Sequence, residues 1–130
     1  TVDAQYEAGP LSLYGAFLGA YRTLGDAVNG NDSFYDYGFL AQAGYMLNEK
    51  MEVFGRYDIL LLDDSALAAG AEDTLHEVTI GLNYYLSGHN AKLTVDGTWL
   101  PNGAPGISGL DFIGSDDDQF VLRGQFQLLL

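Results

Sequence analysis

The sequence of 130 residues contains no cysteine, which excludes disulfides and thiolate metal sites. Basic residues are scarce, because five Lys and Arg stand against 18 Asp and Glu, a formal net charge of −13. Phosphate backbones are bound through Lys and Arg, so we expect no nucleic-acid partner. Long apolar runs are lacking too: the longest, Ile59–Leu62, is far shorter than the ~18 residues of a membrane-spanning helix. No signal peptide is visible, which predicts a mature protein or a fragment.

What the chain has in quantity is glycine (17), tyrosine (9) and phenylalanine (7). Its final stretch, Phe120–Leu130, alternates apolar residues with Arg123, Gln125 and Gln127. Side chains alternate across a strand with period two, so this strand has one apolar and one polar face. Ending on such a strand is typical of an outer-membrane β-barrel, in which the terminal strand closes the barrel and its apolar face meets lipid.

The same alternation predicts seven strands, separated by short turns and long connections in strict succession. The expected strands are Thr1–Ala8, Leu11–Leu24, Phe34–Leu47, Met51–Leu62, Thr74–Leu86, Ala91–Leu100 and Phe120–Leu130. The expected long loops are Gly25–Ser33, Asp63–Asp73 and Pro101–Gln119. This pattern predicts an all-β, antiparallel transmembrane β-barrel with tight periplasmic turns and long outer loops. The acidic residues concentrate in the loops, where a solvated surface is their simplest interpretation.

An odd number of strands does not close an antiparallel barrel, because the first and last strands run in the same direction. An open edge in lipid leaves backbone groups unpaired, at several kcal/mol each. We therefore expect residues 1–130 to be the C-terminal part of one larger barrel. Closure by partner chains and an additional eighth strand are the alternatives.

If the apolar faces meet lipid, the polar faces line the lumen. The expected pore-lining residues are Asp36, Glu52, Arg56, Asp58, Glu77, Lys92, Asp96 and Arg123, joined by Asp3 and Glu7. Acidic rings favour cations, so this acid-rich wall predicts a channel that is general or mildly cation-preferring. The competing interpretation is structural: Arg56 with Glu52 or Asp58, and Lys92 with Asp96, would form ion pairs that only hold the wall together.

No residue pattern predicts a catalytic site, a cofactor site or a metal site. His76 and His89 lie at a strand start and in a turn, with no metal-ligand spacing between them. The run Asp116–Asp118 is a weak candidate for divalent ions that bridge lipopolysaccharide. Aromatic residues near the strand ends are expected in interfacial girdles. These residues are Tyr45, Tyr84, Tyr85 and Trp99.

Several segments in a fixed order carry a resemblance to a known family: Tyr6–Leu13, Ala43–Leu47 followed by Phe54–Asp58, and Thr79–Leu86. They contain a Gly-Pro hairpin, a Gly-Tyr-Met-Leu turn entry with an Arg-Tyr strand, and a Gly-Leu-Asn-Tyr-Tyr strand. In this order they resemble the C-terminal part of the phosphate-selective porin O/P family. The resemblance implies an outer-membrane channel with sixteen strands per subunit, commonly trimeric, that passes small anions.

Two departures from that family stand in the sequence. The chain ends on Leu130, where the family prefers a terminal aromatic residue, and the Arg and Lys residues of the family's pore cannot be placed on it. The leading interpretation is a porin-like channel for small hydrophilic solutes and ions in the bacterial outer membrane, in contact with lipid and lipopolysaccharide. A non-conducting structural outer-membrane barrel and a soluble ligand-binding β-barrel are the alternatives.

Overall fold

The computed structural model describes residues 1–28, 31–63, 73–87, 90–101 and 118–128, and within these ranges it contains seven strands. The strands are β1 (Val2–Ala8), β2 (Leu11–Val28), β3 (Asn31–Asn48), β4 (Met51–Leu61), β5 (Thr74–Ser87), β6 (Ala91–Leu100) and β7 (Gln119–Leu128). In these described ranges, no helix is long and apolar enough to cross a bilayer.

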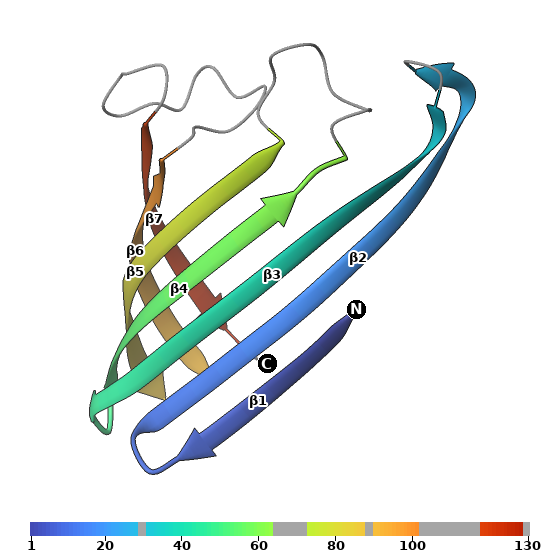
Figure 1. The fold of residues 1–130 in the computed structure, drawn as a ribbon. Coiled ribbons are helices and arrows are strands. Elements are labelled where there is room, and N and C mark those ends of the chain that lie inside the picture. The colour runs from blue at the N-terminus through green and yellow to red at the C-terminus, as the bar shows by residue number, and fades with distance from the viewer. Residues whose placement is uncertain (29–30, 64–72, 88–89, 102–117, 129–130) are drawn as a thin grey trace.

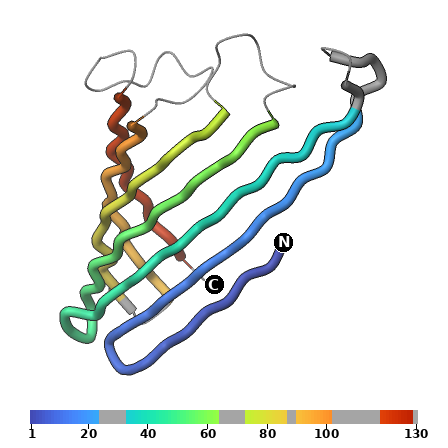
Figure 2. The backbone as a smooth tube through the Cα atoms, viewed as in Figure 1, coloured from blue at the N-terminus to red at the C-terminus, as the bar shows by residue number. Residues whose placement is uncertain are grey.

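The strands form one antiparallel sheet in which each strand pairs with its neighbours in the sequence, in the order β1-β2-β3-β4-β5-β6-β7. Figure 1 shows this sheet curling so that β5, β6 and β7 turn away from the plane of β2 and β3. The backbone trace in Figure 2 places β1 and β7 at its two edges. The predicted all-β antiparallel class is therefore confirmed, and the described sheet is open.

The connection between β2 and β3 differs from its prediction. We expected a long loop over Gly25–Ser33, but β2 continues to Val28 and β3 begins at Asn31. The pairing passes a register shift between Thr23 and Val28, and then Val28 lies opposite Asn31. Gly25 and Asp26, residue types typical of loops, fall in the irregular stretch of β2 between the paired residues Thr23 and Val28. The other two predicted long loops fall largely on residues 64–72 and 102–117, outside the described residues.

Short turns connect the strands at the opposite end of the sheet. Gly9 adopts φ +58°, the left-handed conformation that glycine enters without steric cost. The carbonyl of Pro10 in the same turn accepts a 2.8 Å hydrogen bond from the Met46 amide, and the Lys50 carbonyl accepts one of equal length from Tyr85. Adjacent turns are thus tied to the neighbouring strands. These two hydrogen bonds connect the first short turn to β3 and the second short turn to β5.

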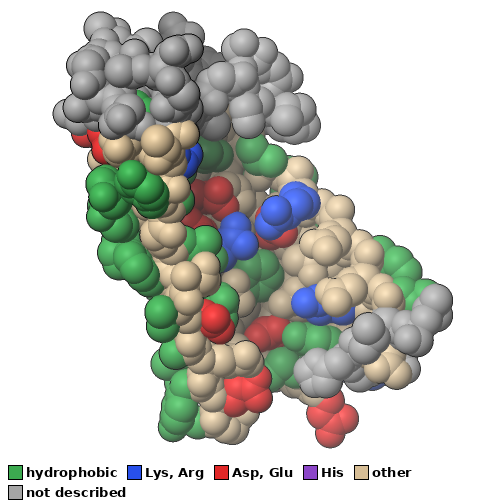
Figure 3. Space-filling model, turned by 90° about the vertical axis from the view of Figure 1, so that its right-hand side faces the viewer, with side chains coloured by type: hydrophobic (Ala, Val, Ile, Leu, Met, Phe, Trp, Pro, Cys, Tyr) green, Lys and Arg blue, Asp and Glu red, His purple; other side chains and the backbone are tan. Residues whose placement is uncertain are grey.

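The two faces of the sheet differ sharply in chemistry, and the difference is opposite to that of a water-soluble domain. Nearly all of the large hydrophobic side chains that are exposed point to the convex face; Leu18 and Leu60 are the exceptions. The concave face holds the charged side chains, as the space-filling view in Figure 3 shows. Several polar side chains on this face are buried: Asp36, Thr79, Asn83, Thr94, Asp96 and Thr98.

Candidate functional site

The charged concave face is the candidate site, and the strand register brings all eight predicted pore-lining residues onto it. They are Asp36, Glu52, Arg56, Asp58, Glu77, Lys92, Asp96 and Arg123. Opposed residues of neighbouring strands share a face, so each of them follows from the register. Asp3 and Glu7 of β1 lie on this face as well.

Arg56 is the centre of the largest ion-pair group on the concave face. Its Nε lies 2.8 Å from Asp58 Oδ2, and its Nη2 lies 2.7 Å from Glu77 Oε1. The expected pair with Asp58 is present, whereas the second partner is Glu77 on the next strand and not Glu52. Thr79 donates to the same Glu77 oxygen at 3.1 Å and shares a 2.7 Å hydrogen bond with Thr98. One polar network thus ties β4, β5 and β6 together.

Asp96 pairs with Arg123, and the predicted pair with Lys92 is wrong. Arg123 Nε donates to Asp96 Oδ2 at 3.1 Å, and its Nη2 lies 3.1 Å from Oδ1 as an ion-pair contact without hydrogen-bond geometry. The register explains the choice, because Arg123 lies directly opposite Asp96 on β7. The Asp96 side chain is 1% exposed and that of Arg123 is 50% exposed. The Asp96 carboxylate is therefore buried in the sheet, and the Arg123 guanidinium lies between it and the solvent.

A fourth ion pair is formed by Arg22, which was not among the expected pore-lining residues. Arg22 Nε lies 2.7 Å from Asp36 Oδ2, and the Asp63 amide donates to Asp36 Oδ1 at 3.2 Å. Both faces of β2 carry apolar residues, so the alternation alone did not show on which face Arg22 lies. Asp36 lies two residues after the buried Phe34 and opposite Ala20 on β2. The pairing of β2 with β3 therefore places Arg22 on the same face as Asp36.

Glu52 is held by neutral donors. Its Oε1 accepts from Ser12 Oγ at 3.1 Å, and its Oε2 accepts from Asn83 Nδ2 at 2.9 Å and from the Tyr85 hydroxyl at 2.6 Å. Thr94 donates to Asn83 Oδ1 at 2.6 Å, which fixes the amide. Tyr85 was expected in an interfacial girdle with Tyr84; it lies on the concave face instead, because successive side chains of a strand alternate.

The aromatic residues that do lie on the convex face include Tyr45, Tyr84 and Trp99, all more than one-third exposed. Trp99 Nε1 donates to Asp118 Oδ1 at 3.1 Å, at the end of the sheet opposite the short turns. Asp118 is the described member of the acidic run 116–118; the other two lie outside the described residues. Placement at the two ends of the strands is consistent with the expected girdles.

The two histidines differ in what the structure says of them. His76 Nδ1 lies 2.8 Å from the Tyr57 hydroxyl, and the two rings stack at 6.1 Å. His89 lies outside the described residues. Over the described part of the chain, no group of three or more His, Asp or Glu is arranged to hold a metal ion.

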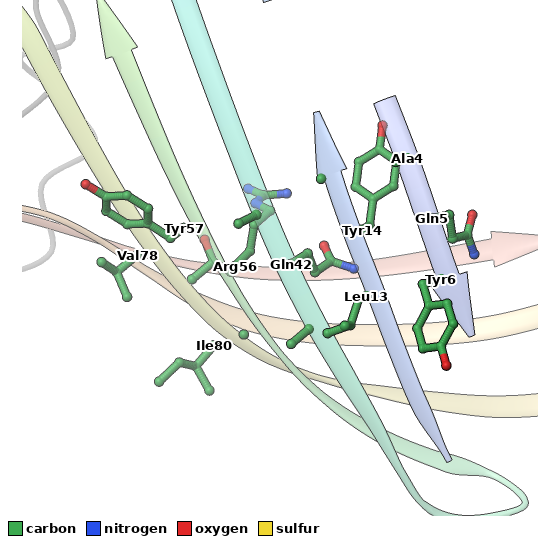
Figure 4. A pocket seen from close by; sticks show the side chains of 15 residues that line it. Ala4, Gln5, Tyr6, Leu13, Tyr14, Gln42, Arg56, Tyr57, Val78 and Ile80 are labelled. Carbon is green, nitrogen blue, oxygen red and sulfur yellow. The ribbon is translucent and has the colours of Figure 1, made fainter. Parts of the chain in front are cut away.

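A groove of about 660 Å³ crosses β1 to β5, and it is almost entirely apolar. Its floor includes the small convex-face residues Gly15, Ala41, Ala43 and Gly55. Figure 4 shows Tyr6 and Leu13 on one side of the groove, with Val78 and Ile80 on the other. The groove is therefore a depression largely within the hydrophobic surface, and Gln5, Gln42 and Arg56 are also among its lining residues.

Comparisons with protein-family models, with curated proteins and with solved structures found no match to this chain.

Proposed function

We propose that this chain forms part of the wall of a transmembrane β-barrel in the bacterial outer membrane, and that the barrel is a channel for passive diffusion of small hydrophilic solutes and ions. The observation that carries the proposal is the inverted distribution of side chains. Bulky apolar groups cover the convex face, while charged and hydrogen-bonded groups occupy the concave face. This is the arrangement of a barrel whose outside meets hydrocarbon and whose inside meets water.

The convex face supports the membrane assignment energetically. Apolar surface costs about 25 cal/mol per Å² when it faces water, and soluble monomers rarely expose contiguous apolar patches of more than a few hundred Å². Here the apolar surface extends over all seven strands. Six of the strands have 10 to 18 residues, enough for the ~9–11 residues that one crossing requires. Lipid and lipopolysaccharide are the partners that fit this face.

The open edges indicate how the barrel is completed. β1 and β7 run in the same direction, because they are the first and last of seven antiparallel strands. Each edge accepts a further antiparallel strand from the same barrel, which removes the unpaired backbone groups that lipid does not tolerate. By the resemblance to the phosphate-selective porin O/P family, the complete barrel has about sixteen strands and assembles as a trimer.

The single tryptophan provides a direct test of the membrane assignment. Trp99 lies on the convex face, so we expect brominated acyl chains to quench its fluorescence after insertion into vesicles. In the matched variant W99F/V121W the tryptophan moves to the concave face, at the level of Thr98. We expect that residue to escape brominated lipid and to be quenched by aqueous iodide. Equal quenching of both proteins by lipid would contradict the two-faced assignment, and solubility without detergent would exclude a membrane barrel.

Conductance tests the channel itself. In a planar bilayer the inserted protein should give discrete current steps, and a barrel that inserts without them is structural and non-conducting. The concave face carries more acids than bases even after Arg22 is added, so we expect a weak preference for cations. A reversal potential that shows clear anion preference in a salt gradient would overturn that expectation.

A further inference from the structure

The carboxylates on the concave face differ in whether they form an ion pair. Asp36, Asp58, Glu77 and Asp96 each form an ion pair with an arginine. Over the described part of the chain, Glu52 forms none, and its contacts are a serine, an asparagine and a tyrosine. A neutral hydrogen bond holds a carboxylate in place without cancelling its charge. Glu52 therefore keeps its negative charge without an ion-paired arginine, whereas Asp36 and Asp96 each have an arginine of their own and Asp58 and Glu77 share Arg56.

The surroundings of Glu52 are built to hold it in one orientation. Gly44 lies beside it on β3, and a Cβ added there would occupy the position of Glu52 Oε1 and lie 2.5 Å from Ser12 Oγ. Only glycine leaves this space open. The donors come from β2 and β5, and Asn83 is itself fixed by Thr94 on β6. Residues of five consecutive strands thus contribute to the position of one carboxylate.

Glu52 lies near one end of β4, where its charge can act on ions that enter the proposed channel. Glu52 is the second residue of β4, next to the turn that follows β3, so it lies at the short-turn end of the concave face. Glu7, an exposed acid whose described partner is Gln5, lies at the same end, opposite Ser12. Lys92 is the base on this part of the face: it lies opposite Tyr85 and interacts electrostatically with Glu52, although over the described residues it lies beyond ion-pair distance of any carboxylate.

From this arrangement we infer that Glu52 is a specificity-determining residue. It is a fixed anion at the channel entrance formed by the short-turn end of the sheet, and it favours small cations over anions. The inference rests on the proposed channel function. A fixed negative charge raises the local concentration of cations and lowers that of anions. Its effect on the cation-to-anion permeability ratio, as a free energy, is therefore twice its effect on either ion alone. Asp36 and Asp96 largely lack this effect, because the arginine beside each one acts on the same ions with opposite sign. The group of Asp58, Glu77 and Arg56 retains one negative charge, but it lies farther from the short-turn end along β4 and β5.

The test is the reversal potential of single channels in a KCl gradient, compared between wild type and Glu52→Gln. Glutamine keeps the length of the side chain and removes the charge; its amide oxygen can still accept from Asn83 and Tyr85, while its NH2 group can donate to the Ser12 hydroxyl. For a charge about 6 Å from the ion path, in water at ~0.1 M salt, we expect the cation-to-anion permeability ratio to fall roughly threefold. Glu49→Gln is the matched control: the same charge change in the adjacent turn, with the ratio unchanged.

The outcomes separate the inference from the function on which it rests. If the wild-type protein inserts but carries no current, the channel proposal fails. If it conducts and Glu52→Gln leaves the ratio at the wild-type value, the inference fails while the channel stands. Should Glu52→Gln not insert, Glu52→Met removes the same charge with an apolar chain of similar length and is expected to lower the ratio equally. A fall of the same size in Glu49→Gln would assign the effect to general surface charge and refute the role of Glu52.

Discussion

Replacing Gly81 by alanine tests how closely the concave face is packed. A Cβ at this position would overlap Phe54 Cζ, lie 2.6 Å from Phe54 Cε1 and lie 2.7 Å from Asp96 Cβ. Favourable carbon contacts begin near 3.5 Å, so each neighbour must move by roughly 0.8 Å or more. The Phe54 ring can turn only against other buried groups, since the residue is 8% exposed. Asp96 Cβ is attached to the backbone of β6 and moves only with that strand.

We therefore expect Gly81→Ala to lower the free energy of unfolding by about 1–2 kcal/mol. Overpacking of a close-packed site costs about 1–3 kcal/mol, and the reduced backbone entropy of the unfolded chain returns about 0.4–1 kcal/mol. The assay is equilibrium urea unfolding in lipid vesicles, followed by Trp99 fluorescence. Truncating the overlapping ring in the double variant G81A/F54L is expected to recover part of the loss.

Gly55→Ala is the matched control, because Gly55 lies in the middle of β4 and the nearest atom to its added Cβ is the Thr79 carbonyl oxygen at 4.0 Å. That variant should unfold at the wild-type urea concentration or slightly above it. If Gly81→Ala and Gly55→Ala have the same unfolding midpoint, the packing argument is refuted. An undiminished loss in G81A/F54L would place the strain on Asp96 and the β6 backbone.

Two further changes probe the polar networks by the same unfolding measurement. Thr79→Val removes the fully buried hydroxyl that forms hydrogen bonds with Thr98 and Glu77. Because both partners lose a hydrogen bond, we expect the free energy of unfolding to fall by about 1–3 kcal/mol. A fall of less than about 0.5 kcal/mol would contradict this reasoning. Arg123→Met leaves the Asp96 carboxylate buried without its ion pair, with an expected loss of about 3 kcal/mol. Adding Asp96→Asn should restore a large part of that stability, and additive losses in the double variant would show that the two residues act independently.

Much of the fold follows from the sequence because a strand with one apolar and one polar face has a period of two residues. The strand beginnings at Leu11, Met51, Thr74 and Ala91 agree with the structure, as does the grouping of the charged residues that were expected to share one face. Alternation determines the face of a residue without knowledge of the rest of the fold. The candidate wall could therefore be assigned from the sequence.

Partners across strands could not be assigned in the same way, because they depend on register. Spacing within one strand suggested Lys92 for Asp96, but the residue opposite Asp96 is Arg123, which is 27 positions away. Arg22 was missed for a related reason, since both faces of β2 carry apolar residues. The extension of β2 to Val28 escaped prediction because an irregular stretch with loop-favouring residues, between Thr23 and Val28, interrupts the alternation.

The strictly sequential strand order has a consequence for how the sheet is made. Each strand pairs with the strand that precedes it in the chain, so every step of assembly is the closing of a local hairpin. Local contacts require little loop-closure entropy, and hairpins form in about 1–10 μs. The sheet can therefore grow by one strand at a time, with the last strand added serving as the template for the next. During such assembly, the unpaired backbone groups on the growing side of the sheet belong to a single strand, the one added last.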